Sequence, residues 1–132
     1  LFFAGILLMV AALNYTGVLQ LWAQKLIDYK YSNFSISTIF GLSSALIDNV
    51  PLVAAAQGMF SQTSFHCDHP FWLMLTLATG LGGSTLIIGS AAGVAAMGQE
   101  GISFGWYIKY ISVLALAGFV SGLLILYMML YL

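Results

Sequence analysis

A single acidic side chain stands inside a long uncharged stretch of this sequence. Asp48 is the only charged residue within 31–67, and its neighbours Asn49 and Ser44 also carry side-chain oxygen atoms. Ser44 lies four residues before Asp48, which would place both side chains on one face of a helix. Carboxylate, amide and hydroxyl oxygens are the ligands that hard cations such as Na⁺ prefer. These residues form a candidate cation site, with Ser43 as a secondary candidate beside it.

A proline close behind Asp48 predicts an interruption of the helix at this point. Pro51 lacks a backbone N–H and disfavours helical geometry in the residue before it. The stretch 35–61 would then form two arms of about 13 residues, each roughly 20 Å long. A re-entrant hairpin with 48–51 at its tip fits this pattern, as does a kinked span. A simpler and compatible role for Asp48 is to cap the second arm, with Pro51 in its first turn.

A second group of candidates lies in a glycine-rich stretch. Three glycines, Gly80, Gly82 and Gly83, lie within four positions there, and Ser84 and Thr85 follow them directly. Because each glycine weakens a helix by up to about 1 kcal/mol relative to alanine, we expect a discontinuous helix over 70–98, broken at these glycines. Ser84 and Thr85 would then face an ion, with Thr79 and Ser90 as secondary candidates. Close helix packing is the alternative reason for the glycines.

Two further polar features have simpler explanations. Asn14 is alone in an apolar helix, where an interhelical hydrogen bond is the expected role and ion binding a secondary one. The four consecutive residues 66–69 (His-Cys-Asp-His) could each bind a metal, but adjacent ligands surround a tetrahedral zinc ion poorly. We expect Asp68 or His69 to start a helix there instead.

The composition indicates the surroundings in which these residues act. Seven of the 132 residues are charged, 61% are hydrophobic, and the mean hydropathy is +1.02. About a quarter of the residues of a soluble domain are charged, so we predict an all-α integral membrane protein. A carboxylate at membrane depth costs at least about 3 kcal/mol, which makes Asp48 a functional candidate by default.

The long apolar stretches at both ends are the simplest membrane spans, and the second of them contains one charged residue, Lys109. Residues 1–24 and 102–132 each exceed the roughly 20 apolar residues that a spanning helix needs. We predict one transmembrane unit over 1–132, made of these spans, a re-entrant hairpin over 35–61 and a broken helix over 70–98. The sequence begins without Met and suggests a fragment of a longer chain. Three lysines and a net charge of −1 exclude a nucleic-acid partner.

Two motifs in this order resemble the NhaD-type family of Na⁺/H⁺ antiporters. They are SSALIDNVPL at 43–52 and ATGLGGSTLIIGSAAG at 78–93. The resemblance implies a C-terminal half, one of two inverted repeats that each hold a re-entrant hairpin and a broken helix. It places Ser44, Asp48 and Asn49 at the hairpin tip and Ser84 in the broken helix, where they would line a Na⁺ site. The family often has an acidic residue where this chain has Asn14.

The resemblance implies sodium/proton antiport. A proton and a Na⁺ or Li⁺ ion would compete for one mid-membrane carboxylate, and exposing it to each side in turn would exchange them. An anion or oxyanion carrier, similar to the arsenite and dicarboxylate carriers of the same superfamily, is an alternative that a charged Asp48 disfavours. A non-transporting membrane subunit is another. No enzyme is expected, since the chain lacks a hydrolase motif and a second intramembrane aspartate.

The expected partners follow from this interpretation. They are the lipid bilayer, Na⁺ and H⁺, and the N-terminal repeat of the same protein, with a second copy of the chain as a further candidate. No cofactor is expected. The expected location is a bacterial inner membrane or an organelle membrane of bacterial origin.

Overall fold

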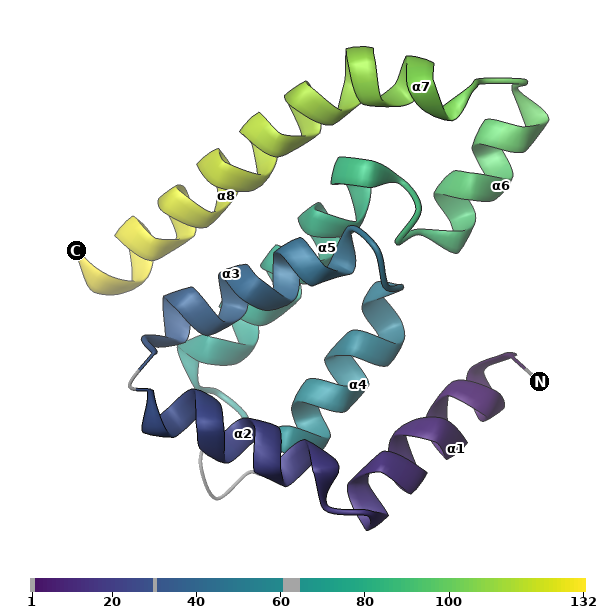
Figure 1. Ribbon diagram of the computed structural model, residues 1–132. Coiled ribbons are helices and arrows are strands. Elements are labelled where there is room, and N and C mark those ends of the chain that lie inside the picture. The colour runs from purple at the N-terminus through teal and green to yellow at the C-terminus, as the bar shows by residue number, and fades with distance from the viewer. Residues whose placement is uncertain (1, 30, 61–64) are drawn as a thin grey trace.

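Regular structure is entirely helical in the parts of the chain that the computed structural model describes, residues 2–29, 31–60 and 65–132 (Figure 1). The helices are α1 (Phe2–Tyr15), α2 (Val18–Asp28), α3 (Asn33–Ser44), α4 (Asn49–Met59), α5 (Pro70–Leu86), α6 (Ala91–Gln99), α7 (Phe104–Tyr107), the π-helical η1 (Ile108–Ser112) and α8 (Val113–Tyr131). The last three follow one another without a break as a single helix of 28 residues.

The first stretch is bent, and this corrects the expectation of a simple span over 1–24. The axes of α1 and α2 meet at 72°. Gly17 lies between them with a φ of +74°, a left-handed conformation that glycine adopts at little cost and that commonly ends a helix. The amide of Gly17 donates to the carbonyl of Asn14 at 3.1 Å, which closes the last turn of α1.

The predicted two-armed structure over 35–61 is present as α3 and α4. The arms contain 12 and 11 residues, and they diverge from a turn at 45–48 to form a V (Figure 1). The hydroxyl of Ser32 caps α3 by accepting from the amide of Ser35 at 3.2 Å. Pro51 lies in the first turn of α4, where its missing N–H would have no helical partner. The break is therefore the turn at 45–48, and Pro51 is the third residue of the helix that follows it.

The helix over 70–98 is broken, but the predicted position of the break was wrong. Gly80, Gly82 and Gly83 all lie within α5, which continues to Leu86. The interruption comes at 87–90, between α5 and α6. A Cβ added to Gly82 would overlap the carbonyl oxygen of Gly41 on α3. Glycine at this position serves close helix packing, which outweighs its weak helix propensity.

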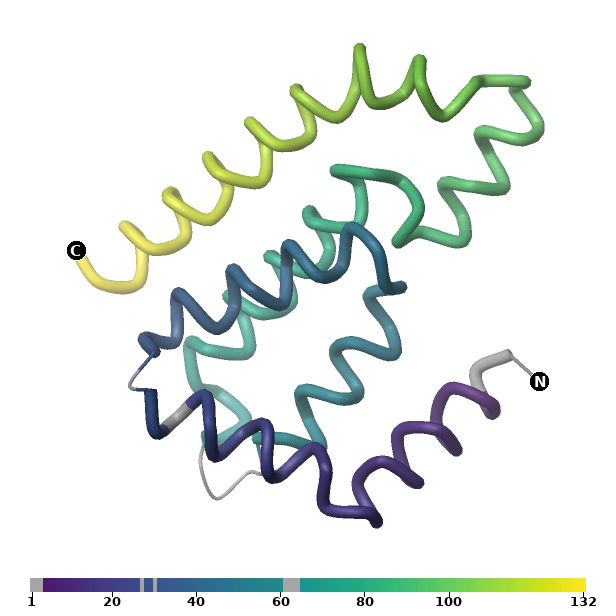
Figure 2. Tube along the Cα trace, viewed as in Figure 1, coloured from purple at the N-terminus to yellow at the C-terminus, as the bar shows by residue number. Residues whose placement is uncertain are grey.

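The helix α5 lies at the centre of the described structure. Figure 2 shows α3 and α8 running alongside it, α3 in a similar direction and α8 in the opposite one. Seven buried side chains form one hydrophobic cluster that joins α2, α3, α4 and α5: Ala23, Ile36, Phe40, Ala56, Phe60, Phe71 and Leu75. A second cluster, of Ala78, Phe119 and Leu123, joins α5 to α8. The first cluster holds the V of α3 and α4 against α5, and the second holds α8 against α5.

The described residues include two helical stretches that are long and apolar enough to cross a membrane. These are Pro70–Gln99, which contains the break, and Phe104–Tyr131. The bent pair α1 and α2 would make a third if it crossed as one span. Large apolar side chains of α8, such as Leu114 at 70% exposure, point away from the protein. An apolar surface of this kind is suited to lipid, and the protein is an all-α integral membrane protein.

Candidate functional site

The turn at 45–48 and the break at 87–90 touch each other. The amide of Gly89 donates a hydrogen bond to the carbonyl of Ala45 at 2.9 Å. A Cβ on Gly89 would overlap the carbonyl oxygen of Ser44, so the backbones meet only because this residue is glycine. The residue Ile87 has a φ of +60°, which is strained for a β-branched side chain. The two interruptions form one junction, and we refer to them as the break junction.

Ser44 joins α3 to α5 beside this junction. Its side chain is fully buried, and its hydroxyl donates to the carbonyl of Thr79 at 2.7 Å. A Cβ built on Gly83 would lie 3.4 Å from the Ser44 Oγ, so this glycine also faces Ser44. The hydroxyl of Thr79 donates back to Leu75 in its own helix at 2.9 Å. Ser44 is therefore held in one place by the glycine-rich face of α5.

Asp48 caps α4, as the simpler sequence interpretation expects. Its Oδ1 accepts from the amide of Val50 at 3.0 Å, and the side chain is half-buried. The backbone of Asp48 is not helical, with φ −52° and ψ 137°. Asn49 follows as the first residue of α4 and its side chain is exposed. The carboxylate thus lies where the hairpin turn becomes helical again, at the α4 end of the break junction.

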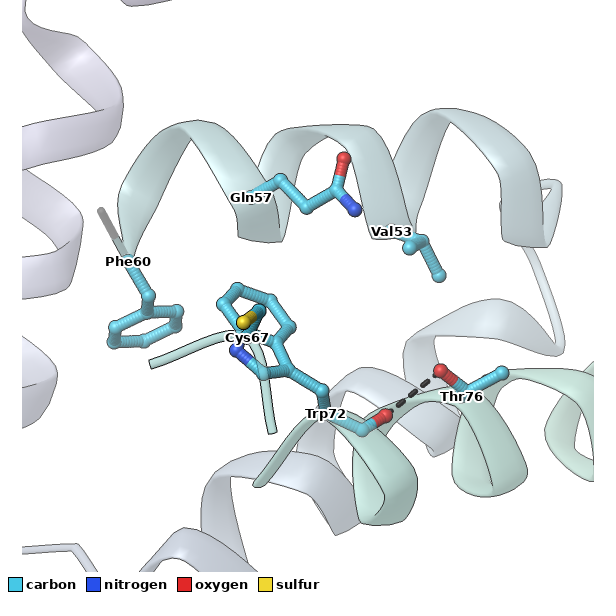
Figure 3. Close-up of a pocket in the computed structure, with 6 residues that line it drawn as sticks. All are labelled: Val53, Gln57, Phe60, Cys67, Trp72 and Thr76. Atoms are coloured by element: carbon cyan, nitrogen blue, oxygen red, sulfur yellow. Dashed lines mark hydrogen bonds between the residues drawn. The ribbon is translucent and has the colours of Figure 1, made fainter. Parts of the chain in front are cut away.

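A groove runs between α4 and α5 from Asn49 toward the loop before α5. One cavity of about 410 Å³ is lined by Asn49, Val50, Val53, Ala54, Gln57, Thr76, Thr79 and Gly80. A second of about 410 Å³, shown in Figure 3, is lined by Val53, Gln57, Phe60, Cys67, Trp72 and Thr76. Because the two cavities share Val53, Gln57 and Thr76, they adjoin one another. We call the pair the α4/α5 groove.

Several predicted site residues lie outside this groove. The side chain of Ser84 is exposed, and its carbonyl accepts from the Tyr107 hydroxyl at 2.7 Å. The Thr85 hydroxyl is buried and donates to Gly82 at 2.6 Å. The Ser43 hydroxyl donates to Ile39 at 2.9 Å, within α3.

The remaining predicted residues have roles at helix ends. Ser90 caps α6 by accepting from the amide of Gly93 at 3.1 Å. Asn14 accepts a hydrogen bond from the side chain of Gln20, so the expected interhelical bond is present and spans the bend between α1 and α2. His69 caps α5 through its Nδ1, which accepts from Phe71 at 3.1 Å. Within the described ranges, no three metal-binding side chains gather around one point.

The structure brings together one part of the predicted site and separates the other. Ser44 bonds to Thr79, and Thr79 shares a cavity with Asn49. Gln57 and Thr76 also line this cavity, although neither was named from the sequence. A signal for Gln57 was available, because Asn49, Val53 and Gln57 recur every four residues and so share one face of α4.

Comparisons with known proteins give the chain a family. It is 48% identical over 124 residues to "Sodium/proton antiporter 1" of Arabidopsis thaliana, covering 93% of this chain and 21% of the relative. It is 43% identical over 99 residues to "Na(+)/H(+) antiporter NhaD" of Alkalimonas amylolytica, covering 75% of this chain and 20% of the relative. A third relative, "Na(+)/H(+) antiporter NhaD" of Halomonas elongata, is 37% identical over 130 residues, which cover 95% of this chain and 24% of that protein.

The match extends over most of this chain but only over part of each relative. The chain spans between a fifth and a quarter of the length of these three proteins. No family model matches the chain, and no solved structure matches it. The relatives are named as antiporters, which are transporters and not enzymes. On the similarity of its sequence to these proteins, the chain belongs to the NhaD-type family of sodium/proton antiporters.

Proposed function

We propose that this chain is the part of a sodium/proton antiporter that holds the transported cation at the tip of the α3–α4 hairpin. Asp48 would be the carboxylate that Na⁺ and H⁺ share, with Asn49 and Ser44 as further oxygen ligands. The observation that carries the proposal is the position of Asp48. It is the single charged residue of 31–67, and it lies at a helix interruption that is hydrogen-bonded to a second one.

The helix ends at the break junction favour a cation. The helices α3 and α5 run in similar directions and end at Ser44 and Leu86, so both carboxyl ends point toward the junction (Figure 1). A helix carboxyl end carries about half a negative charge, and its last carbonyls lack helical partners. Broken helices in transporters use such carbonyls to coordinate Na⁺. We leave the side chains of Ser84 and Thr85 out of the site, because Ser84 is exposed and the Thr85 hydroxyl is bonded within α5.

The proposed mechanism is competition for one group. When Asp48 is protonated, its charge is lost and Na⁺ binds weakly. When Na⁺ is bound, the proton is displaced. If the site faces each side of the membrane in turn, each cycle carries Na⁺ one way and H⁺ the other. The second repeat that the family resemblance implies would supply the surface against which this unit moves.

An anion or oxyanion carrier is less well supported. Such carriers hold anions at the amino ends of half-helices, where backbone N–H groups are free. In this chain the Asp48 carboxylate already accepts from the Val50 amide at the amino end of α4. An incoming anion would meet this negative charge.

The relatives come from a plant and from bacteria, which fits either a bacterial plasma membrane or an organelle membrane of bacterial origin.

The test is the substitution Asp48→Asn in the full-length protein, reconstituted in lipid vesicles. We expect Na⁺-driven proton movement, followed with a pH-sensitive dye, to be lost while the variant still inserts and folds. Asp28→Asn is the matched control, because Asp28 is exposed at the end of α2. In the unaltered protein, the apparent KM for Na⁺ should rise in proportion to the proton concentration. Exchange by Asp48→Asn at the unaltered rate would refute the proposal, and loss of insertion by this variant alone would favour a non-transporting subunit.

A further inference from the structure

The α4/α5 groove reaches from the hairpin tip to the opposite end of the hairpin. Asn49 and Thr79 line one end, and Cys67 and Trp72 line the other. Gln57 and Thr76 stand between them and belong to both cavities. In Figure 3, Gln57 projects from α4 and Thr76 lies on α5 across the groove. The groove is thus continuous along about two turns of each helix.

The polar groups of this groove are spread along its length on α4 and α5. Gln57 lies eight positions after Asn49, which corresponds to about 12 Å along α4. The lining residues between them on α4 are the apolar Val50, Val53 and Ala54, so the polar groups are spaced apart. The hydroxyl of Thr76 donates to the carbonyl of Trp72 at 2.7 Å, as the dashed line in Figure 3 marks, and its oxygen lone pairs can still accept. Polar side chains at membrane depth are costly and mark ion pathways.

We propose that the α4/α5 groove is the water-filled route by which the cation reaches Asp48 from one side of the membrane, with Gln57 and Thr76 as its midway ligands. The proposal rests on the proposed function and adds to it a path and two residues. An amide oxygen and a hydroxyl can replace part of the hydration shell of a monovalent cation. Both are neutral, so they let the ion leave again, as conduction requires. The charged ligand, Asp48, directly precedes the lining residue Asn49 at one end of the groove.

The test uses cysteine accessibility in the full-length protein, in a background with Cys67→Ser and any other native cysteines replaced. Gln57→Cys and Thr76→Cys are made one at a time. The probe is a quaternary-ammonium methanethiosulfonate, a water-soluble cation that reacts with thiols in contact with water. Labelling is read by mass, so the result does not depend on the activity of the variant. Leu73→Cys is the matched control, because Leu73 lies on α5, is 58% exposed, and does not line the groove.

We expect labelling of Gln57→Cys and Thr76→Cys from one side of the membrane, at least tenfold slower in saturating Na⁺, and loss of exchange once labelled. Na⁺ should not change the labelling of Leu73→Cys. In an added Asp48→Asn background, the protection by Na⁺ should disappear. The inference is overturned if neither groove cysteine reacts, or if Na⁺ leaves both rates unchanged, while Asp48→Asn still abolishes exchange. Exchange by Asp48→Asn at the normal rate would instead overturn the proposed function.

Discussion

The amide of Gly89 donates to the carbonyl of Ala45 at 2.9 Å, and this hydrogen bond joins the break after α5 to the hairpin turn after α3. The contact links two parts of the chain that are 44 residues apart in sequence. Both partners are backbone groups, so the bond forms only when the two backbones lie close together. The position of Asp48, three residues beyond Ala45, therefore depends on the position of the break in the other helix.

Replacing Gly89 with alanine should separate these two backbones. The added Cβ would overlap the Ser44 carbonyl oxygen, and we expect a loss of about 1–3 kcal/mol of stability from overpacking. Thermal unfolding of the full-length protein in detergent, with Na⁺ exchange in vesicles, measures both effects. Gly80→Ala is the matched control, because a Cβ there meets nothing within 4 Å in this chain. An unfolding temperature for Gly89→Ala equal to that of Gly80→Ala would show that the junction has room to move.

The buried hydroxyl of Ser44 should affect both packing and ion affinity. Ser44→Ala removes its hydrogen bond to the Thr79 carbonyl and leaves that acceptor buried, at a cost of about 1–3 kcal/mol. If Ser44 is also a ligand, the apparent KM for Na⁺ rises more than the maximal rate falls. Ser43→Ala is the control, since this hydroxyl bonds only within α3. Equal KM values for the two variants would leave Ser44 a structural role alone.

The Tyr107 hydroxyl ties the last helix to the end of α5. It donates to the carbonyl of Ser84 at 2.7 Å, two residues before the end of α5. We expect Tyr107→Phe to cost about 1 kcal/mol and to increase hydrogen exchange at 84–90. Tyr110→Phe is the comparison, because Tyr110 is exposed and its ring, which lies 5.3 Å from Lys109, is retained. Identical exchange in both variants would mean that this tether does not hold the break.

Much of the local structure could be predicted from residue types. Low charge predicts a membrane protein, Asp48 followed by Pro51 predicts a capped helix start, and His69 before Pro70 predicts another. The two predicted caps are confirmed, because a cap depends on a few consecutive residues. The bend at Gly17 was missed, although a threonine-glycine pair after an apolar helix is a typical signal for its end.

The break in the second helix shows where prediction from sequence failed. Glycine is a weak helix former, so the dense glycines of 80–83 suggested the break. Those residues remain helical, and Ile87 adopts the left-handed conformation instead. Nothing in the local sequence predicts a positive φ for isoleucine, because the conformation is intrinsically unfavourable. The surrounding contacts must stabilise this conformation, including the packing of the Ile87 side chain against Gly93.

The sequence by itself therefore determined the helical membrane class, the family, the helix caps and Asp48 as the candidate carboxylate, since each depends on composition or on a short run of residues. Only the tertiary structure decided that Gly82 and Gly89 serve contacts between backbones, and that Gln57 and Thr76 line one groove. These relations join residues from separate helices. They follow from which surfaces fit together, and spacing along the chain does not encode that fit in any local pattern.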